Sequence, residues 1–362
     1  MKKLLALVLA LVMVLAATSA FAEDLLKIGY VQVGHESDWR MANTQNYYDV
    51  FTKDAGFELE LIDCDNDHAL QLAKVREFVQ KDFDYIVIDP IQTAGWDDVL
   101  KEVQDAGIPC IIADRSVDAP DSLYTTAVGT NMEAEGETAG KWLEEYLAGK
   151  AAKILVIEGT TGSSAAIGRA DGFNKVAANH PEWEILASQD GDFTQNGGQA
   201  VMEDFIKRFP EFDVVVCHND NEAYGAMDAM DAAGIKYGVD GKIIISFDAT
   251  NEGLTRTLAG KILCNVECNP IQAVIVMNVI KALQAGEAVE KFTLVPDEGF
   301  CAPGFGYRSR GYRRGMDELQ GRKKSMFLCI KRICDRRSRF SGNTGHQRAP
   351  HHERVKSCPL AR

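Results

Sequence analysis

The sequence predicts an α/β protein in which helices cover parallel β-sheets and the sheets are divided between two lobes. From residue 25 to about residue 295, short apolar runs alternate with segments whose apolar residues recur at helical spacing. This alternation is typical of parallel strands joined by right-handed crossover helices. More than ten strands are expected, which is many for one open sheet, so two lobes of about six strands each are favoured.

The elements are expected in the following order along the chain. Strands are predicted at residues 26–31, 59–63, 85–89, 110–114, 125–129, 153–158, 185–191, 214–218, 243–247, 263–267 and 292–295. Helices are predicted at residues 69–81, 96–106, 133–148, 167–178, 198–208, 222–233 and 272–284. A further helix is expected to follow the first strand and to reach Val50, with Ser37 as its N-cap.

The first 22 residues have the pattern of a secretory signal peptide. A basic start at residues 1–3 precedes an apolar run at 4–17, and Ala20 and Ala22 supply the small residues of a cleavage site. We expect cleavage near Ala22 and an exported mature chain; an uncleaved anchor is the alternative. No other stretch has the apolar length that a spanning helix needs.

Charge divides the chain into an acidic body and a basic tail. The formal net charge of −14 combines −26 in residues 1–306 with +12 in residues 307–362. The acidic body argues against nucleic acid as a partner. The tail shows neither helix nor strand periodicity and is expected to be disordered. It is either a basic arm for anionic surfaces or the product of a frameshift near residues 302–307.

Cofactor and metal motifs are not found in the sequence. The 9 cysteines are dispersed with no CxxC, so their spacing specifies neither a metal site nor a disulfide. Cys110 and Cys217 lie in apolar runs and are expected to be small buried side chains. The Gly-rich loop at 159–169 lacks both the GxxxxGK[ST] and the GxGxxG spacing, so no nucleotide site and no cofactor are predicted.

Polar clusters follow several of the predicted strands. They comprise Glu36–Arg40, Asp89-Pro90, Asp114-Arg115, Glu158–Ser164, His218–Asn221 and Asp248. Ligands of parallel α/β sheets bind beyond the carboxyl ends of the strands. If the two lobes face each other, these clusters would meet at one cleft.

The clusters have the chemistry that a polyhydroxylated ligand requires. Arg115 and Arg169 offer planar forks of donors, Asp114 and Asp248 offer acceptors, and Asn219 offers an amide. Glu36, Ser37 and Arg40 add two charges and a hydroxyl, while Trp39 and Phe193 are candidate stacking faces. The alternatives are helix caps, ion pairs and core aromatics.

Catalysis is the weaker hypothesis. Glu36, Asp114 and Asp248 could in principle form the carboxylate pair of a glycoside hydrolase. The sequence contains no GxSxG and no HExxH, and no nucleophile with a base is indicated. We therefore expect a protein that is not an enzyme.

These segments resemble the periplasmic solute-binding proteins of ABC sugar importers, the ribose-binding type I family. Within it they are most similar to galactofuranose-binding proteins. The resemblance spans residues 25–305 and is carried by 29–40 (GYVQVGHESDWR), 89–118, 158–173 (EGTTGSSAAIGRADGF), 188–194 (SQDGDFT) and 218–220. His35 and Asp38 depart from the small residues expected there, which leaves the exact sugar open.

The resemblance implies two Rossmann-like lobes joined by a three-segment hinge. The N-terminal lobe would comprise residues 25–129 and 269–295, and the C-terminal lobe 130–268 and 296–306. It implies a periplasmic monomer that captures a monosaccharide and delivers it to the permease subunits of an ABC importer. The implied ligand-binding residues are Glu36, Ser37, Asp38, Trp39, Arg40, Asp114, Arg115, Arg169, Phe193, Asn219, Asp248 and Glu267.

Three alternatives remain open. A periplasmic sensor subunit for a chemoreceptor or histidine kinase would bind sugar in the same way. LacI-type repressors share the lobes, but here a signal peptide stands in place of their DNA-binding helices. A glycosidase would turn its ligand over, whereas a binding protein would return it unchanged.

Overall fold

A computed structural model describes residues 25–297 and 299–302. The predicted signal peptide at 1–22 and the predicted tail at 307–362 lie outside the described residues, as do residues 298 and 303–306 of the segment 296–306. Among the residues that are described, no helix has the length and apolar character needed to cross a membrane.

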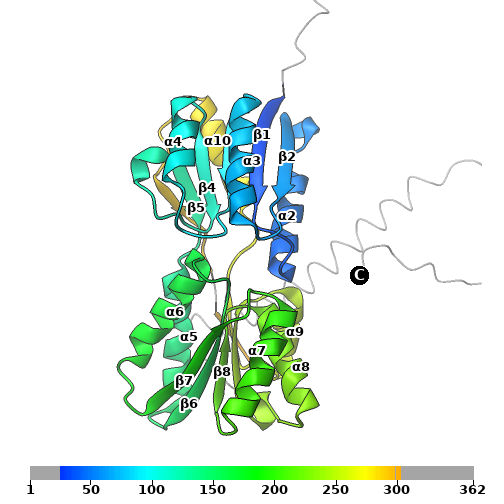
Figure 1. Cartoon of the computed structure of the whole chain (residues 1–362), viewed down its shortest axis with the longest axis vertical. Helices are drawn as coiled ribbons and strands as arrows, with labels where there is room; N and C mark the ends of the chain where they lie inside the picture. Colours follow the sequence, from blue (N-terminus) through cyan, green and yellow to red (C-terminus); the bar gives the residue numbers. More distant parts are fainter. Residues whose placement is uncertain (1–24, 298, 303–362) are drawn as a thin grey trace, which may run out of the picture. The chain divides into compact units, whose positions relative to one another are not determined.

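Two six-stranded sheets form the framework (Figure 1). The first has the order β11-β5-β4-β3-β1-β2 and is parallel throughout. Its strands are β1 (Leu26–Gln32), β2 (Phe57–Asp63), β3 (Tyr85–Ile88), β4 (Cys110–Asp114), β5 (Thr126–Gly129) and β11 (Phe292–Leu294). We call this sheet with its helices the N-terminal lobe.

The second sheet repeats this order as β12-β10-β9-β8-β6-β7. Its strands are β6 (Ala152–Glu158), β7 (Trp183–Asp190), β8 (Val214–Cys217), β9 (Ile243–Asp248), β10 (Cys264–Glu267) and β12 (Gly299–Cys301). Only β12 is antiparallel to its neighbour within this described sheet. We call this sheet with its helices the C-terminal lobe. Because the orders match, β1, β3 and β4 correspond to β6, β8 and β9.

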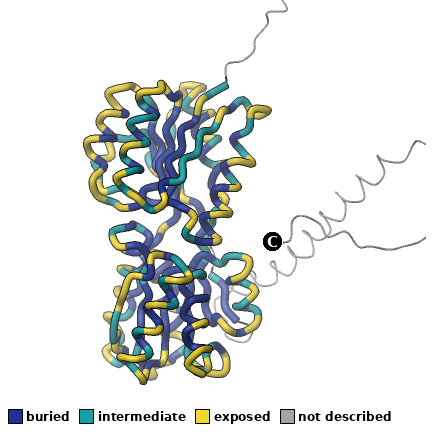
Figure 2. Tube along the Cα trace, turned by 45° about the vertical axis from the view of Figure 1, so that its right-hand side comes forward, coloured by how far each residue is buried: buried dark blue, intermediate teal, exposed yellow. Residues whose placement is uncertain are grey.

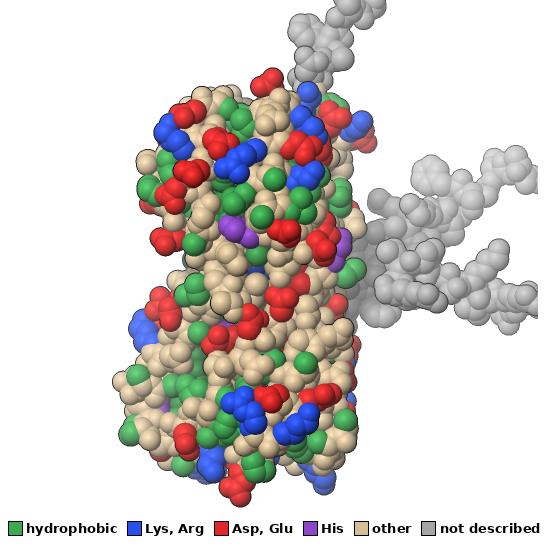
Figure 3. Space-filling view, in the orientation of Figure 1, with side chains coloured by type: hydrophobic (Ala, Val, Ile, Leu, Met, Phe, Trp, Pro, Cys, Tyr) green, Lys and Arg blue, Asp and Glu red, His purple; other side chains and the backbone are tan. Residues whose placement is uncertain are grey.

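Helices cover both faces of each sheet, and the strands form the buried centre (Figure 2). The N-terminal lobe contains α2 (Asp38–Val50), α3 (His68–Gln80), α4 (Asp97–Asp105) and α10 (Ala273–Gln284). The C-terminal lobe contains α5 (Met132–Leu147), α6 (Ser164–Ala177), α7 (Gln195–Arg208), α8 (Asp220–Ala232) and α9 (Asn251–Leu258). On the face seen in Figure 3, acidic and basic side chains are interspersed over both lobes.

Side-chain caps fix the starts of the helices that follow the strands. Ser37 Oγ accepts a hydrogen bond from the N–H of Arg40 at 3.1 Å, which confirms the predicted N-cap of α2. Ser163 and Asn219 cap α6 and α8 in the same way. Each cap satisfies one of the orphan donors of a helix N-terminus and places the first turn beside a strand end.

The chain passes between the two sheets three times, from β5 to α5, from β10 to α10 and from β11 to β12. These passages are where a three-segment hinge is predicted. The exact residue bounds of the two lobes stay a prediction.

The α/β class with two mainly parallel sheets is confirmed, and every predicted strand is present. Among the strands and α-helices of the described residues, β12 and α9 were not predicted. The three residues of β12 are too few to show a period, and α9 contains Gly253 and two threonines, which are weak helix formers.

Helices α5 and α6 approach each other closely at two glycines. A Cβ on Gly136 would lie 2.2 Å from the Arg169 carbonyl oxygen, and one on Gly172 would lie 2.0 Å from that of Glu133. Neither approach permits a side chain unless a helix moves.

We predict that Gly172→Ala lowers the free energy of unfolding by about 1–3 kcal/mol, because the added methyl group overpacks the contact between α5 and α6. Denaturant unfolding monitored by circular dichroism measures this change. Gly34→Ala is the matched control, since its Cβ would meet its nearest atom at 3.4 Å. Equal stability of the two variants would contradict the argument.

Candidate functional site

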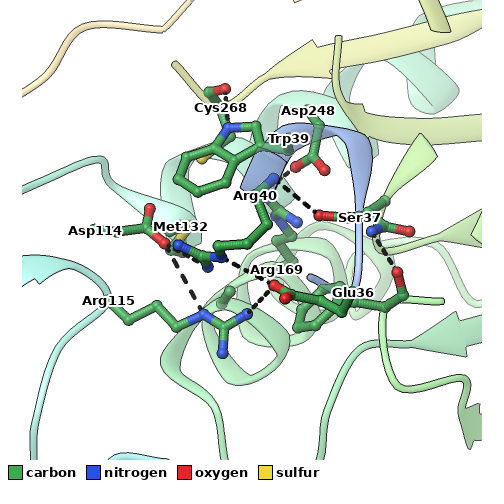
Figure 4. Close-up of a pocket in the computed structure, with 13 residues that line it drawn as sticks. Glu36, Ser37, Trp39, Arg40, Asp114, Arg115, Met132, Arg169, Asp248 and Cys268 are labelled. Atoms are coloured by element: carbon green, nitrogen blue, oxygen red, sulfur yellow. Dashed lines mark hydrogen bonds and ion pairs between the residues drawn. The ribbon is translucent and has the colours of Figure 1, made fainter. Parts of the chain in front are cut away.

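A cavity lies between the lobes, at the carboxyl ends of their strands, and its empty space of about 280 Å³ includes space open to solvent (Figure 4). Both lobes and the passages between them contribute side chains. The lining residues are Glu36, Ser37, Trp39, Arg40, Asp114, Arg115, Met132, Ala165, Arg169, Phe193, Asn219, Asp248 and Cys268.

Arg40, near the start of α2, is surrounded by three carboxylates. Its Nε donates to Glu36 Oε1 at 3.0 Å and its Nη2 to Asp114 Oδ2 at 3.1 Å, while Nη1 donates to Asp89 Oδ2. The side chain is 2% exposed. Most of its donors are therefore committed within the protein, and its main effect is to hold the acids in place.

Arg169 plays the same part in the C-terminal lobe. Its Nε donates to Glu135 Oε2 at 2.8 Å and its Nη2 to Asp248 Oδ1 at 3.0 Å, while Nη1 donates to the carbonyl oxygen of His218. Its guanidinium also lies 5.0 Å from the ring centre of Phe247. The second arginine thus connects the ends of β8 and β9 to helix α5.

The two arrangements are related by the repeat of the sheets. Arg40 follows β1 as Arg169 follows β6, and Asp114 ends β4 as Asp248 ends β9. Both aspartates have left-handed backbones, with φ of 60° for Asp114 and 89° for Asp248. Such conformations are uncommon outside glycine and concentrate at functional sites.

Arg115 has weaker internal partners. Its Nη2 lies 3.8 Å from Glu36 Oε1, its Nε lies 4.0 Å from Asp114 Oδ2, and its Nη1 donates to the carbonyl oxygen of Ile91 at 3.4 Å. It stacks across the cleft on Phe193, 5.1 Å from the ring centre. Of the three cavity arginines, Arg115 retains the most capacity to donate to a ligand.

Acceptor capacity is also unused inside the cavity. Glu36 Oε2 is buried and has no hydrogen-bond partner among the described residues. Burial alone would raise the pKa of Glu36, but Arg40 and Arg115 lower it below its ordinary value. An ionised oxygen beside a cavity suits a hydroxyl donor, because a buried unpaired acceptor is costly.

Apolar side chains complete the enclosure. Trp39 of the N-terminal lobe forms one buried cluster at the cavity with Met132, Ala165, Ala166 and Phe193 of the C-terminal lobe and with Cys268 on a passage between them. The indole Nε1 of Trp39 donates to the carbonyl oxygen of Cys268 at 2.6 Å, which fixes the ring at the wall (Figure 4). The guanidinium of Arg40 lies over the Trp39 ring, 4.6 Å from its centre, so one face of the indole is already covered.

Four hydrogen bonds join the lobes around the cavity. The backbone N–H of Asp38 donates to Asn221 Oδ1 at 3.0 Å, and that of Thr93 donates to the Gly162 carbonyl oxygen at 2.9 Å. The backbone N–H of Ser116 donates to Ser164 Oγ at 2.9 Å, and the side-chain amide of Asn66 donates to Asp192 Oδ1 at 2.9 Å. The lobes are therefore in contact across the cleft.

Burial raises the pKa of three further acids of the site, Asp248, Asp89 and Glu135. It raises the pKa of Asp248 to about 7, an effect that Arg169 partly offsets. It also raises the pKa of Asp89 and of Glu135. With acids of raised pKa beside fixed guanidinium groups, the site is close to neutral and suits an uncharged polar ligand.

Ten of the twelve predicted binding residues line this cavity; the exceptions are Asp38 and Glu267. Asp38 is the first residue of α2 and its side chain is exposed, so only its N–H reaches the other lobe. Glu267 ends β10 but is not part of the lining. Asn219 does line it, although its Oδ1 caps α8 and its Nδ2 donates to the carbonyl oxygen of Phe193 at 2.9 Å.

Five residues of the site were not in the predicted set. Met132, Ala165 and Cys268 line the cavity, while Asp89 and Glu135 hold the two buried arginines. The strand-end position of Asp89 was a usable signal. Glu135 lies inside α5, where no motif distinguishes it.

No group of three or more His, Cys, Asp or Glu side chains in the described part of the chain could hold a metal ion.

We predict that the stability of the wild type falls relative to that of Asp248→Asn as the pH rises from about 4 to about 7. In that window the unfolded aspartate loses its proton while the folded one, with a pKa of about 7, keeps it. The difference in free energy of unfolding between the wild type and Asp248→Asn changes by at most ~1.4 kcal/mol per pH unit and is constant above pH 7. Denaturant unfolding at several pH values measures it. A difference independent of pH would contradict the raised pKa.

Comparison with known proteins places the chain among binding proteins. Residues 28–288 match the family described as periplasmic binding protein domain. The chain is 37% identical over 274 residues to the galactofuranose-binding protein YtfQ of Escherichia coli, covering 74% of this chain and 86% of the relative. It is 31% identical over 285 residues to the fructose import binding protein FruE of Bifidobacterium longum, covering 76% and 84%.

Solved structures agree. A Mycobacterium smegmatis protein in complex with β-D-fucofuranose matches with a TM-score of 0.76 and 37% identity, over 84% of this chain and 98% of the other. A galactofuranose-binding protein matches with a TM-score of 0.73 and 36% identity, over 76% and 94%. The binding protein of the arabinose ABC transporter of Shewanella sp. ANA-3, bound to L-arabinofuranose, matches with a TM-score of 0.73 and 34% identity. The match covers 76% of this chain and 91% of the other. The chain belongs to the periplasmic binding protein family, of the type I sugar-binding kind with ribose- and galactofuranose-binding relatives.

Proposed function

We propose that this protein captures an uncharged monosaccharide, a galactofuranose-like sugar, between its lobes outside the cytoplasm and delivers it to the permease of an ABC importer. The observation that carries the proposal is the pocket between the lobes, which Arg115 and Glu36 line with donor and acceptor capacity that the protein itself does not use.

The ring form is argued from relatives at 34–37% identity, whose printed names or titles include galactofuranose, fucofuranose and arabinofuranose. The role in import, rather than sensing, is argued from relatives named as import binding proteins. Their names as binding proteins also support a role other than catalysis. The glycosidase alternative has a further difficulty, because Glu36, Asp114 and Asp248 are each held by an arginine.

In this mechanism Arg115 donates to neighbouring hydroxyls, Glu36 accepts from one, and Trp39 and Phe193 cover the C–H faces. We propose that the ligand-binding set comprises the ten lining residues of the predicted twelve. The passages between β5 and α5, β10 and α10, and β11 and β12 would act as the hinge, and the closed monomer would dock on the permease. A sugar then stabilises the closed form by adding contacts that the open form lacks.

Isothermal titration of the purified full chain against D-galactose, D-fucose, L-arabinose, D-ribose and D-fructose tests the proposal. We expect saturable binding of at least one sugar with a dissociation constant near 1 µM or below, about −8 kcal/mol. Arg115→Ala should weaken it by about 10-fold to 100-fold, because a hydrogen bond to a charged group contributes ~1.5–3 kcal/mol. Arg208→Ala, exposed on α7, is the matched control.

Two outcomes would count against the assignment. One is unchanged affinity of Arg115→Ala for the sugar that the wild type binds. The other is conversion of that sugar or of its glycosides into a product, followed by chromatography during the titration.

We also predict discrimination against anionic sugars. Three arginines share the site with five buried carboxyl side chains, Glu36, Asp89, Asp114, Glu135 and Asp248. A negatively charged sugar would lose its hydration in a site that is already close to neutral. D-Galacturonate should therefore bind at least about 100-fold more weakly than D-galactose in the same titration. Equal affinities would show that Arg115 accepts a carboxylate and that the site is not selective for neutral ligands.

A further inference from the structure

Two cysteines of the C-terminal lobe lie opposite each other on neighbouring strands. Cys264 begins β10 and Cys301 ends β12, and the antiparallel register pairs these two residues directly. Of the six cysteines in the described residues, these are the two that the strand register brings together.

A neighbouring backbone hydrogen bond shows which kind of position in the antiparallel ladder the two cysteines occupy. The N–H of Ala302 donates to the carbonyl oxygen of Leu263 at 3.0 Å, one residue beyond Cys301 and one before Cys264. Cys264 and Cys301 therefore occupy a non-hydrogen-bonded position of the antiparallel ladder. At such positions the Cα atoms are about 4.5 Å apart and the side chains approach each other on one face.

This spacing matches the geometry of a disulfide, which joins residues whose Cα atoms are about 4.4–6.8 Å apart. Both side chains are buried and belong to the same apolar cluster of the C-terminal lobe, with Leu263 and Val266. A bond between them would therefore link two facing strands inside this apolar cluster.

We propose that Cys264 and Cys301 form a disulfide in the exported protein. The inference rests on the proposed location outside the cytoplasm, where thiols are oxidised. The thiolate of one cysteine attacks the disulfide of an external disulfide oxidant, and a mixed disulfide forms as one oxidant thiol leaves. The second cysteine thiolate then displaces the other oxidant thiol. The pair loses two electrons and two protons, and the oxidant becomes a dithiol.

The crosslink would close a loop that contains most of the hinge. Residues 264–301 leave the C-terminal lobe after β10, form α10 and β11 in the N-terminal lobe, and return at β12. The bond fastens both ends of this excursion to one sheet, including the three-residue edge strand β12. Loops of this length are strongly restricted in the unfolded chain by a crosslink, which stabilises the fold.

Mass spectrometry of the full chain, secreted and purified without reductant, tests the inference directly. After alkylation in denaturant and digestion with trypsin, fragments 262–281 and 292–308 should remain joined, about 2 Da lighter than the two reduced fragments together. Fragment 262–281 also contains Cys268, so Cys268→Ser must retain the link. Alkylation of both Cys264 and Cys301 in the unreduced protein would overturn the proposal.

Thermal unfolding provides the second measurement. Dithiothreitol should lower the Tm of the wild type by about 5–15 °C. The double variant Cys264→Ala/Cys301→Ala should not respond to it. Cys217→Ala, which removes a buried thiol of β8 in the same sheet, should respond as the wild type does. A response of the double variant equal to that of the wild type would contradict the assignment.

A sugar titration of the same oxidised preparation separates the two proposals. Protein that binds sugar with both thiols alkylated refutes the disulfide alone. Protein that carries the crosslink but binds no monosaccharide refutes the proposed ligand alone. Refolding in glutathione buffers of defined potential tests formation of the bond without reference to export.

Discussion

The structure depends on two guanidinium groups that are removed from water at corresponding places in the two lobes. A buried charge is tolerated only when carboxylates and carbonyl oxygens satisfy its donors. Arg40 gathers the ends of β3 and β4 around the start of α2, and Arg169 gathers the ends of β8 and β9 around α5 and α6. Loss of either arginine would leave several acids buried without a cation, so each lobe's half of the cavity is specified by one residue.

Because the two buried arginines are bound to acids of the protein, few residues of the site remain available to a ligand. The buried arginines consume the acceptors that surround them, whereas Arg115 has only long contacts and Glu36 retains one oxygen. Specificity would then come mainly from Arg115 and Glu36, which the surrounding buried ion pairs hold in place. A site organised in this way rejects an incorrect ligand by leaving these few groups unpaired.

Much of this architecture could be predicted from the sequence, because strands and their polar ends are local features. The apolar runs that end at Asp114 and Asp248 indicated both the sheets and the edge where ligands bind. The partners of a side chain are not local. Arg40 was predicted as a ligand contact, yet its donors are bound by Asp89 and Asp114, 49 and 74 residues away. Glu135, inside a helix, and Cys268, on a passage between the lobes, carried no pattern that would have identified them.

The indole of Trp39 has a consequence for observing the molecule at work. It belongs to the N-terminal lobe, yet it donates to a carbonyl on the passage that follows β10 and packs among residues of both lobes. The other tryptophans, Trp96, Trp142 and Trp183, lie within single lobes. Opening would expose this one fluorophore to water while the remaining three keep their surroundings, so the protein carries an intrinsic optical reporter of its own conformation.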